Sequence, residues 1–120
     1  HPDAIPYGQP LLEAASVAPD IRSPDYLADR PRDLELSIDA GIAGALGAGK
    51  ADVLLAPMSA AAKCTGKAGA PVIAIPAGLD ADGLPFGVTV FAAPGQDARV
   101  LQAALLVERS AGERIAPVLA

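Results

Sequence analysis

Three short apolar runs predict β-strands in the second half of the chain, at residues 53–55, 72–75 and 86–91. The first two are apolar without alternation, which is typical of strands that helices cover on both faces. The third alternates loosely and follows Pro85, whose missing backbone donor is harmless at the start of a strand. The pattern therefore predicts a small sheet between helices, without fixing the strand directions.

A long helix is predicted before the first strand. Ser23 can cap free backbone amides and Pro24 suits the first helical position. Pro31 predicts a kink or a restart, because a proline inside a helix costs about 3 kcal/mol. Gly47 and Gly49 are expected to end the helix. Its apolar face is expected to consist of Leu27, Leu34, Ile38, Ile42 and Leu46.

Shorter elements complete the predicted order. Residues 11–17 form a short helix after Pro10, and residues 57–69 form a loop of small residues. Asp82-Gly83 is a turn signal that can close a hairpin between the last two strands. A final helix is expected after Asp97 as its cap, ending at Gly112. Its apolar face is expected to hold Val100, Leu101, Ala104 and Leu105.

Composition and charge narrow the class of protein. A chain of 120 residues with 52% apolar residues can form one domain, so a single domain over residues 1–120 is expected. The net charge is −5, with acids and bases interspersed, which argues against a nucleic-acid partner. The single cysteine fits a reducing compartment, and no apolar run reaches the ~18 residues of a membrane span. A cytoplasmic protein without a membrane partner is therefore expected.

Residues 44–50 have the glycine and lysine spacing of a phosphate-binding loop. Ala51 follows where magnesium would need a hydroxyl, and the segment ends a predicted helix and precedes a strand. A phosphate-binding loop has the opposite order, because it follows a strand and opens a helix. A glycine-rich helix end is therefore the preferred interpretation, and a nucleotide-binding module is the weaker one.

Few side chains are suited to catalysis or metal binding. Ser59 and Lys63 lie four residues apart and could form a nucleophile–base pair if the lysine were buried, although a surface lysine is the simpler interpretation. Cys64 and His1 are the only residues of their types, and Cys64 is interpreted as an inert packing thiol. No catalytic residue, metal ligand or cofactor is predicted from these residues.

Several short motifs occur in a fixed order along almost the whole chain. The most specific is Ala-Gly-Ala-Pro-Val-Ile-Ala-Ile-Pro-Ala-Gly at 68–78, followed by Asp-Gly-Leu-Pro-Phe-Gly-Val at 82–88. The other motifs lie at 1–3, 7–9, 23–26, 41–42 and 52–57, with Arg114 and Pro117 near the end. In order and spacing these motifs resemble the C-terminal part of amidase signature family enzymes.

The resemblance implies an α/β fold: a partial α/β/α sandwich with helices packed on a small mixed sheet. It also implies hydrolysis of a carboxamide by a serine nucleophile, a second serine and a lysine base. In the family these groups lie in an earlier glycine- and serine-rich segment, and this chain contains no Gly-Gly or Ser-Ser pair. No catalytic residue is therefore carried over.

The expected function is that of the C-terminal portion of an amidase signature hydrolase, with the catalytic segment outside this chain. The implied partners are the remaining N-terminal part of the amidase, or a second copy through self-association, and a small-molecule amide substrate in the complete enzyme. The alternative is a stand-alone, non-catalytic domain for binding or assembly. The residues expected nearest the substrate, from their place after a strand end, are Pro57, Met58, Ser59, Cys64 and Thr65.

Overall fold

The structure is a computed structural model that describes residues 5–112 and 114–116. The motif at residues 1–3 and Pro117 lie outside the described residues. The chain divides into two compact units, His1–Pro31 and Arg32–Ala120. The expectation of one domain over residues 1–120 stays a prediction.

The first unit contains a short helix and the start of a longer one. Helix α1 spans Pro10–Ser16 with Pro10 in its first turn, in agreement with the predicted short helix, and none of its residues is buried. Helix α2 spans Pro24–Leu34. The backbone N–H of Tyr26 donates to the hydroxyl of Ser23 at 3.3 Å, which confirms the predicted cap.

Of the predicted kink or restart at Pro31, the restart is wrong, because Pro31 lies inside α2. The kink stays a prediction. One missing hydrogen bond does not end a helix whose neighbouring turns remain bonded. The chain continues as a π-helix, η2, at Glu35–Ala43 and as helix α3 at Gly44–Gly49. Lys50 then takes the left-handed conformation that ends α3, with φ 48° and ψ 41°. The glycine-rich segment is thus a helix end before a strand, as predicted.

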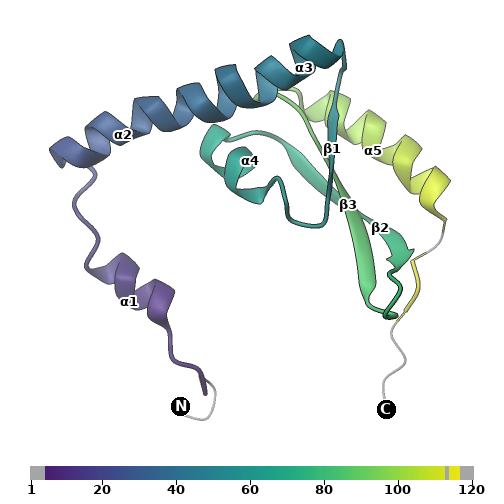
Figure 1. Cartoon of the computed structure of the whole chain (residues 1–120), viewed down its shortest axis with the longest axis horizontal. Helices are drawn as coiled ribbons and strands as arrows, with labels where there is room; N and C mark the ends of the chain where they lie inside the picture. The colour runs from purple at the N-terminus through teal and green to yellow at the C-terminus, as the bar shows by residue number, and fades with distance from the viewer. Residues whose placement is uncertain (1–4, 113, 117–120) are drawn as a thin grey trace. The chain divides into compact units, whose positions relative to one another are not determined.

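Three strands form the sheet of the second unit in the order β1-β3-β2. They span Leu54–Pro57 (β1), Val72–Leu79 (β2) and Pro85–Phe91 (β3), and both pairings are antiparallel (Figure 1). The predicted hairpin between β2 and β3 is confirmed, and its short turn allows only antiparallel pairing. The resemblance implied a mixed sheet, and in this respect the described strands differ from it.

Each outer strand carries a proline whose nitrogen faces away from the sheet. The carbonyl of Gly87 in β3 accepts a hydrogen bond from the N–H of Met58 at 2.9 Å, so the backbone groups of Gly87 point toward β1. Pro76, which lies opposite Gly87, therefore turns its nitrogen to the outer edge of β2. Pro57 lies opposite Val88, the next residue of β3, and turns its nitrogen to the outer edge of β1. A missing donor costs no ladder hydrogen bond at either place.

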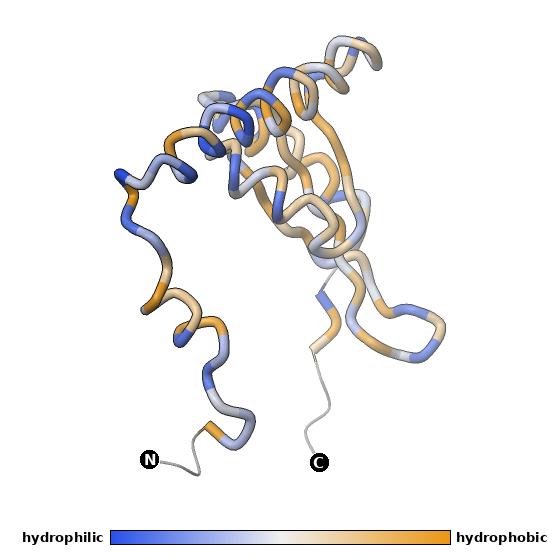
Figure 2. Tube along the Cα trace, turned by 60° about the vertical axis from the view of Figure 1, so that its left-hand side comes forward, coloured by the Kyte–Doolittle hydropathy of each residue, from blue (hydrophilic) through white to orange (hydrophobic). Residues whose placement is uncertain are grey.

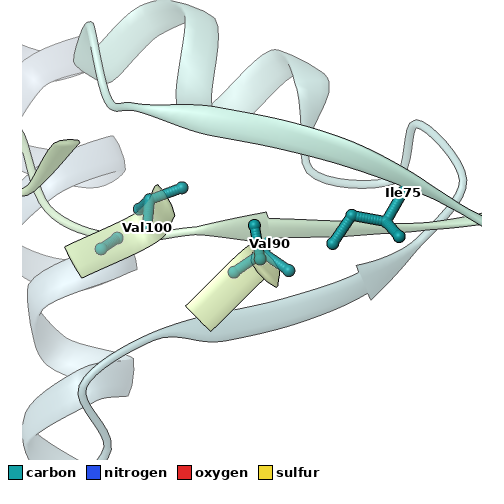
Figure 3. Packing of buried hydrophobic residues seen from close by; sticks show 5 residues of the cluster. Ile75, Val90 and Val100 are labelled. Atoms are coloured by element: carbon teal, nitrogen blue, oxygen red, sulfur yellow. The ribbon is translucent and has the colours of Figure 1, made fainter. Parts of the chain in front are cut away.

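Helix α5, at Asp97–Ala111, packs on one face of the sheet. Its Val100 and Ala104 join Ile75 and Val90 of the strands in a buried cluster (Figure 3). The predicted face of α5 is thus half correct, because Leu101 and Leu105 are 59% and 46% exposed. Asp97 is the predicted N-cap of this helix. In the structure Gln96 is the N-cap and Asp97 is the first residue of α5.

The opposite face of the sheet is covered in part by η2 and by helix α4, at Ala62–Ala68. Figure 1 shows α4 and α5 on opposite sides of the strands, and Figure 2 shows apolar residues along the strands between them. Buried Ile42, Ala61, Ala68 and Phe91 form this second cluster. The predicted α/β class, with helices on both faces of a small sheet, is confirmed.

The loop predicted for residues 57–69 is wrong over its second half, where the structure has α4. Its residues are mostly small and show no apolar period, so the pattern of hydrophobic positions gave no helix signal. Gly69 at its end, with φ 65°, is the left-handed residue that often ends a helix and could have indicated it. Among the described residues, no helix has the length and apolarity that a bilayer crossing requires.

Candidate functional site

A hollow of about 1290 Å³ lies on the face of the sheet opposite α5. Helix α4 forms one wall, strands β2 and β3 form the floor, and residues 114–116 contribute a further wall. Its volume is above the ~300–1,000 Å³ of typical small-molecule sites. Lining residues include Met58, Ser59, Thr65, Val72, Ala74, Phe86, Thr89, Arg114 and Ile115.

The lining of this hollow is largely apolar or glycine, and two of its polar side chains, Thr65 and Thr89, are already bonded. The hydroxyl of Thr65 donates to the carbonyl of Ala61 at 3.0 Å, and that of Thr89 donates to the carbonyl of Met58. The hydroxyl of Ser59 makes no hydrogen bond to another residue in the part of the chain that the structure describes. Ser59 is thus a polar group that a ligand could meet.

Met58 is held in a strained conformation at the rim of the hollow. Its φ of 48° is in the left-handed region, which a residue other than glycine adopts at a cost of about 1 kcal/mol. Its N–H bonds the carbonyl of Gly87 at 2.9 Å, and the N–H of Gly87 donates to its sulfur at 3.2 Å. With the hydroxyl of Thr89 on its carbonyl, these bonds fix the turn from β1 to Ser59.

The structure brings three of the five predicted site residues together. Met58, Ser59 and Thr65 line the large hollow. Cys64 lines a second hollow of about 270 Å³ beside η2, where its thiol lies 3.5 Å from the carbonyl of Ser37. Consecutive residues of a helix differ by about 100° in direction, which separates Cys64 from Thr65. Pro57 is exposed at the end of β1 and lines neither hollow.

Lys63 is not brought together with Ser59 in this hollow. It lies on α4, is exposed and lines neither hollow. Its exposure agrees with the interpretation as a surface lysine. Within residues 5–112 and 114–116, no group of three His, Cys, Asp or Glu side chains is placed to hold a metal ion.

Two parts of the hollow were not predicted from the sequence. They are the face of β2 that lies away from α5 and the segment 114–116 after α5. Val72 and Ala74 alternate with Ile73 and Ile75 along β2, and this alternation could have indicated that Val72 and Ala74 face away from the α5 cluster. Ile75, which packs in that cluster, also borders the hollow. Arg114 belongs to the Arg-x-x-Pro motif, but no pattern in the sequence indicated that it lies beside the sheet.

Comparison with known proteins relates the chain to amidases. No family model matches it. The glutamyl-tRNA(Gln) amidotransferase A subunits of Rhizorhabdus wittichii and Roseobacter denitrificans are each 44% identical to it over 45 residues. This match covers 38% of the chain and 9% of each relative, so the chain spans only a small part of the curated proteins it matches.

Solved structures match over most of the chain. The native peptide amidase of Stenotrophomonas maltophilia gives a TM-score of 0.75 at 26% identity, covering 88% of this chain and 24% of that one. A peptide amidase in complex with the competitive inhibitor chymostatin gives a TM-score of 0.71 at 26% identity, covering 90% of this chain and 25% of that one. The chain is therefore related to the amidase signature family and corresponds in fold to about a quarter of a peptide amidase.

Proposed function

We propose that the chain is the C-terminal portion of an amidase signature hydrolase, an enzyme that cleaves a carboxamide C–N bond when it is complete. The observation that carries this proposal is the match with the S. maltophilia peptide amidase, which extends over 88% of this chain and only 24% of that one. The catalytic serines and lysine of such an enzyme would lie in the part that this chain does not match.

In the complete enzyme this portion contributes one wall of the substrate pocket. Met58, Ser59 and Thr65 line the large hollow, and the fixed conformation of Met58 sets the position of Ser59. An amide substrate presents a carbonyl and an N–H, and the hydroxyl of Ser59 can bond either of them. Most other lining residues are apolar, and they suit the apolar part of a substrate.

The partner of this portion is the remaining N-terminal part of the amidase. Val72, Leu79 and Phe86 line the hollow and are 48%, 47% and 36% exposed. Apolar side chains exposed together on one face are typical of a surface that another polypeptide covers. Association of two copies of the chain through the same face is the other way to cover them.

Co-expression tests the proposal directly. The coding sequence upstream of His1 is expected to encode a glycine-rich Ser-Ser segment with a lysine before it. Co-expression of that segment with this chain is expected to yield hydrolysis of a simple carboxamide, which neither part shows alone. Ser59→Ala is expected to raise the KM, and Lys63→Ala, outside the hollow, serves as the matched control. Hydrolysis by the purified chain alone, lost on replacement of Ser59 or Lys63, would overturn the proposal.

The second candidate is a stand-alone, non-catalytic domain for binding or assembly. It is favoured by one observation, that α4, strands β2 and β3, and the segment 114–116 together give the hollow walls on more than one side. A start codon adjacent to His1 would favour this candidate over the first. Under it, the chain would bind ligand but would not gain hydrolytic activity with any added amidase segment.

A further inference from the structure

We propose that the large hollow binds a molecule with an extended apolar body and a carboxylate, and that Arg114 pairs with the carboxylate. The inference goes beyond the proposed function, because this binding needs no catalytic group and no second polypeptide. It rests on the volume of the hollow, its lining, and the charged groups in and around it.

The lining selects an apolar ligand body. Along the floor, Val72, Ala74 and Pro76 of β2 lie beside Gly87 and Thr89 of β3. Thr89 is 6% exposed and its hydroxyl is bonded to Met58, so it offers no free donor to a ligand. An apolar chain laid across this floor would remove exposed aliphatic surface from water, which favours binding.

Charge selects the head group of the ligand. Arg114 is the only charged residue among the described residues that line the hollow. A guanidinium presents paired N–H donors that match the two oxygens of a carboxylate. A cationic ligand would be repelled by Arg114, and a neutral one would leave the guanidinium without an anionic partner.

Two other charged groups near the hollow, those of Asp80 and Lys67, are engaged elsewhere. The carboxylate of Asp80, in the hairpin turn, accepts the N–H groups of Asp82 and Leu84 at 3.0 and 2.9 Å. Lys67 of α4 forms an ion pair with Asp33 and does not line the hollow. Arg114 is in neither of the salt bridges between described residues, Lys67–Asp33 and Arg99–Asp52.

Calorimetric titration of the whole chain tests the inference with three probes of equal chain length: decanoate, decanol and decylamine, each below its micelle concentration. Decanoate is expected to bind about tenfold more tightly than decanol, as one charge-assisted pair allows. Decylamine is expected to bind most weakly. Equal affinity for decanoate and decanol would overturn the proposal.

Matched variants assign the preference to one residue. Arg114→Gln is expected to lower the affinity for decanoate to that for decanol and to leave decanol binding unchanged. Arg109→Gln, in the last turn of α5 and outside the hollow, is the control and is expected to keep the preference. Unchanged decanoate binding by Arg114→Gln would overturn the assignment. Circular dichroism of both variants checks that the fold is kept.

A second copy of the chain could occupy the hollow in place of the carboxylate ligand. Titration at several protein concentrations, with light scattering to follow the mass, distinguishes the two occupants. If two copies cover each other's hollow, decanoate affinity will fall as protein concentration rises, and that result would overturn the proposal. A constant affinity would support it. Failure of carboxylate binding leaves the co-expression test of hydrolysis unaffected, so the two proposals fail separately.

Discussion

The two faces of the sheet differ in how completely they are covered. On the α5 side, Ile75, Val90 and Val100 are at most 4% exposed and pack together in one cluster. On the other side, α4 and η2 cover only the part around Phe91, and the rest of β2 borders the hollow. Since the same strands supply both faces, alternate side chains of one strand lie toward the α5 cluster and toward the hollow, although Ile75 of the cluster also borders the hollow.

The largest expected effect compares Ile75, buried in the α5 cluster, with Val72, three residues before it on β2 and exposed at the hollow. Ile75→Ala is expected to lower the free energy of unfolding by about 3 kcal/mol, because it leaves a cavity in the α5 cluster. Val72→Ala, at a residue that is 48% exposed on the hollow side, is expected to cost less than about 1 kcal/mol. Urea denaturation followed by circular dichroism measures both. Equal losses would contradict the difference between the faces.

The second prediction concerns the tight backbone turn inside η2, the π-helix that covers part of the hollow side of the sheet. A Cβ at Gly41 of η2 would lie 2.7 Å from the carbonyl oxygen of Leu36 and 3.5 Å from the sulfur of Cys64. Gly41→Ala is therefore expected to destabilise the fold by about 2 kcal/mol. Gly47→Ala meets no atom within 4 Å and is expected to stabilise α3 by up to about 1 kcal/mol. Thermal unfolding of the two variants should shift in opposite directions, and a shared direction would contradict the packing.

The third prediction concerns the hydroxyl of Thr89 in the floor of the hollow. Thr89→Val keeps the shape of a side chain that is 6% exposed but removes the hydroxyl that bonds Met58. We expect a loss of about 1 kcal/mol in the free energy of unfolding. Ser110→Ala removes an exposed hydroxyl bonded to the carbonyl of Leu106 at 2.9 Å and should change stability by less than about 0.5 kcal/mol. If Thr89→Val proves neutral, the hydroxyl does not hold the turn at Met58.

The smallest effect is expected at the ion pair that joins α5 to Asp52, two residues before β1. The guanidinium of Arg99 lies 2.9 Å from a carboxylate oxygen of Asp52, and both side chains are more than half exposed, at 52% and 82%. A double-mutant cycle with Arg99→Ala and Asp52→Ala should give a coupling below about 0.5 kcal/mol. It should vanish in 1 M salt, where the screening length is about 3 Å. A coupling as large as the loss at Ile75 would mean that surface charge, not packing, holds α5 in place.

Much of the fold could be predicted from the sequence, because its signals are local. Pro24 after Ser23, the glycines before Lys50 and the Asp82-Gly83 turn each act through the backbone of a few neighbouring residues, and all three appear in the structure. Helix α4 could not be predicted in this way. Its small residues carry no apolar period, and its Thr65 and Ala68 are buried by contacts with segments distant in the sequence.

Less of the candidate site could be predicted, because the hollow is made by tertiary contacts. The place of residues 57–65 after a strand indicated Met58, Ser59 and Thr65, which do line it. The same reasoning could not separate Cys64 from Thr65, since that needs the direction of each side chain on a helix that was not predicted. Nor could it place Arg114, which reaches the hollow only through the path of the chain after α5.

The outward nitrogens of Pro57 and Pro76 limit how this sheet can grow. A strand added alongside either edge would meet no backbone donor at the proline. It could form a ladder of hydrogen bonds only along the residues before the proline. Fibril-like stacking of many copies through these edges is disfavoured for the same reason. A polypeptide that binds this molecule would therefore gain most of its contact area by lying across the open face, with strand addition confined to a short stretch.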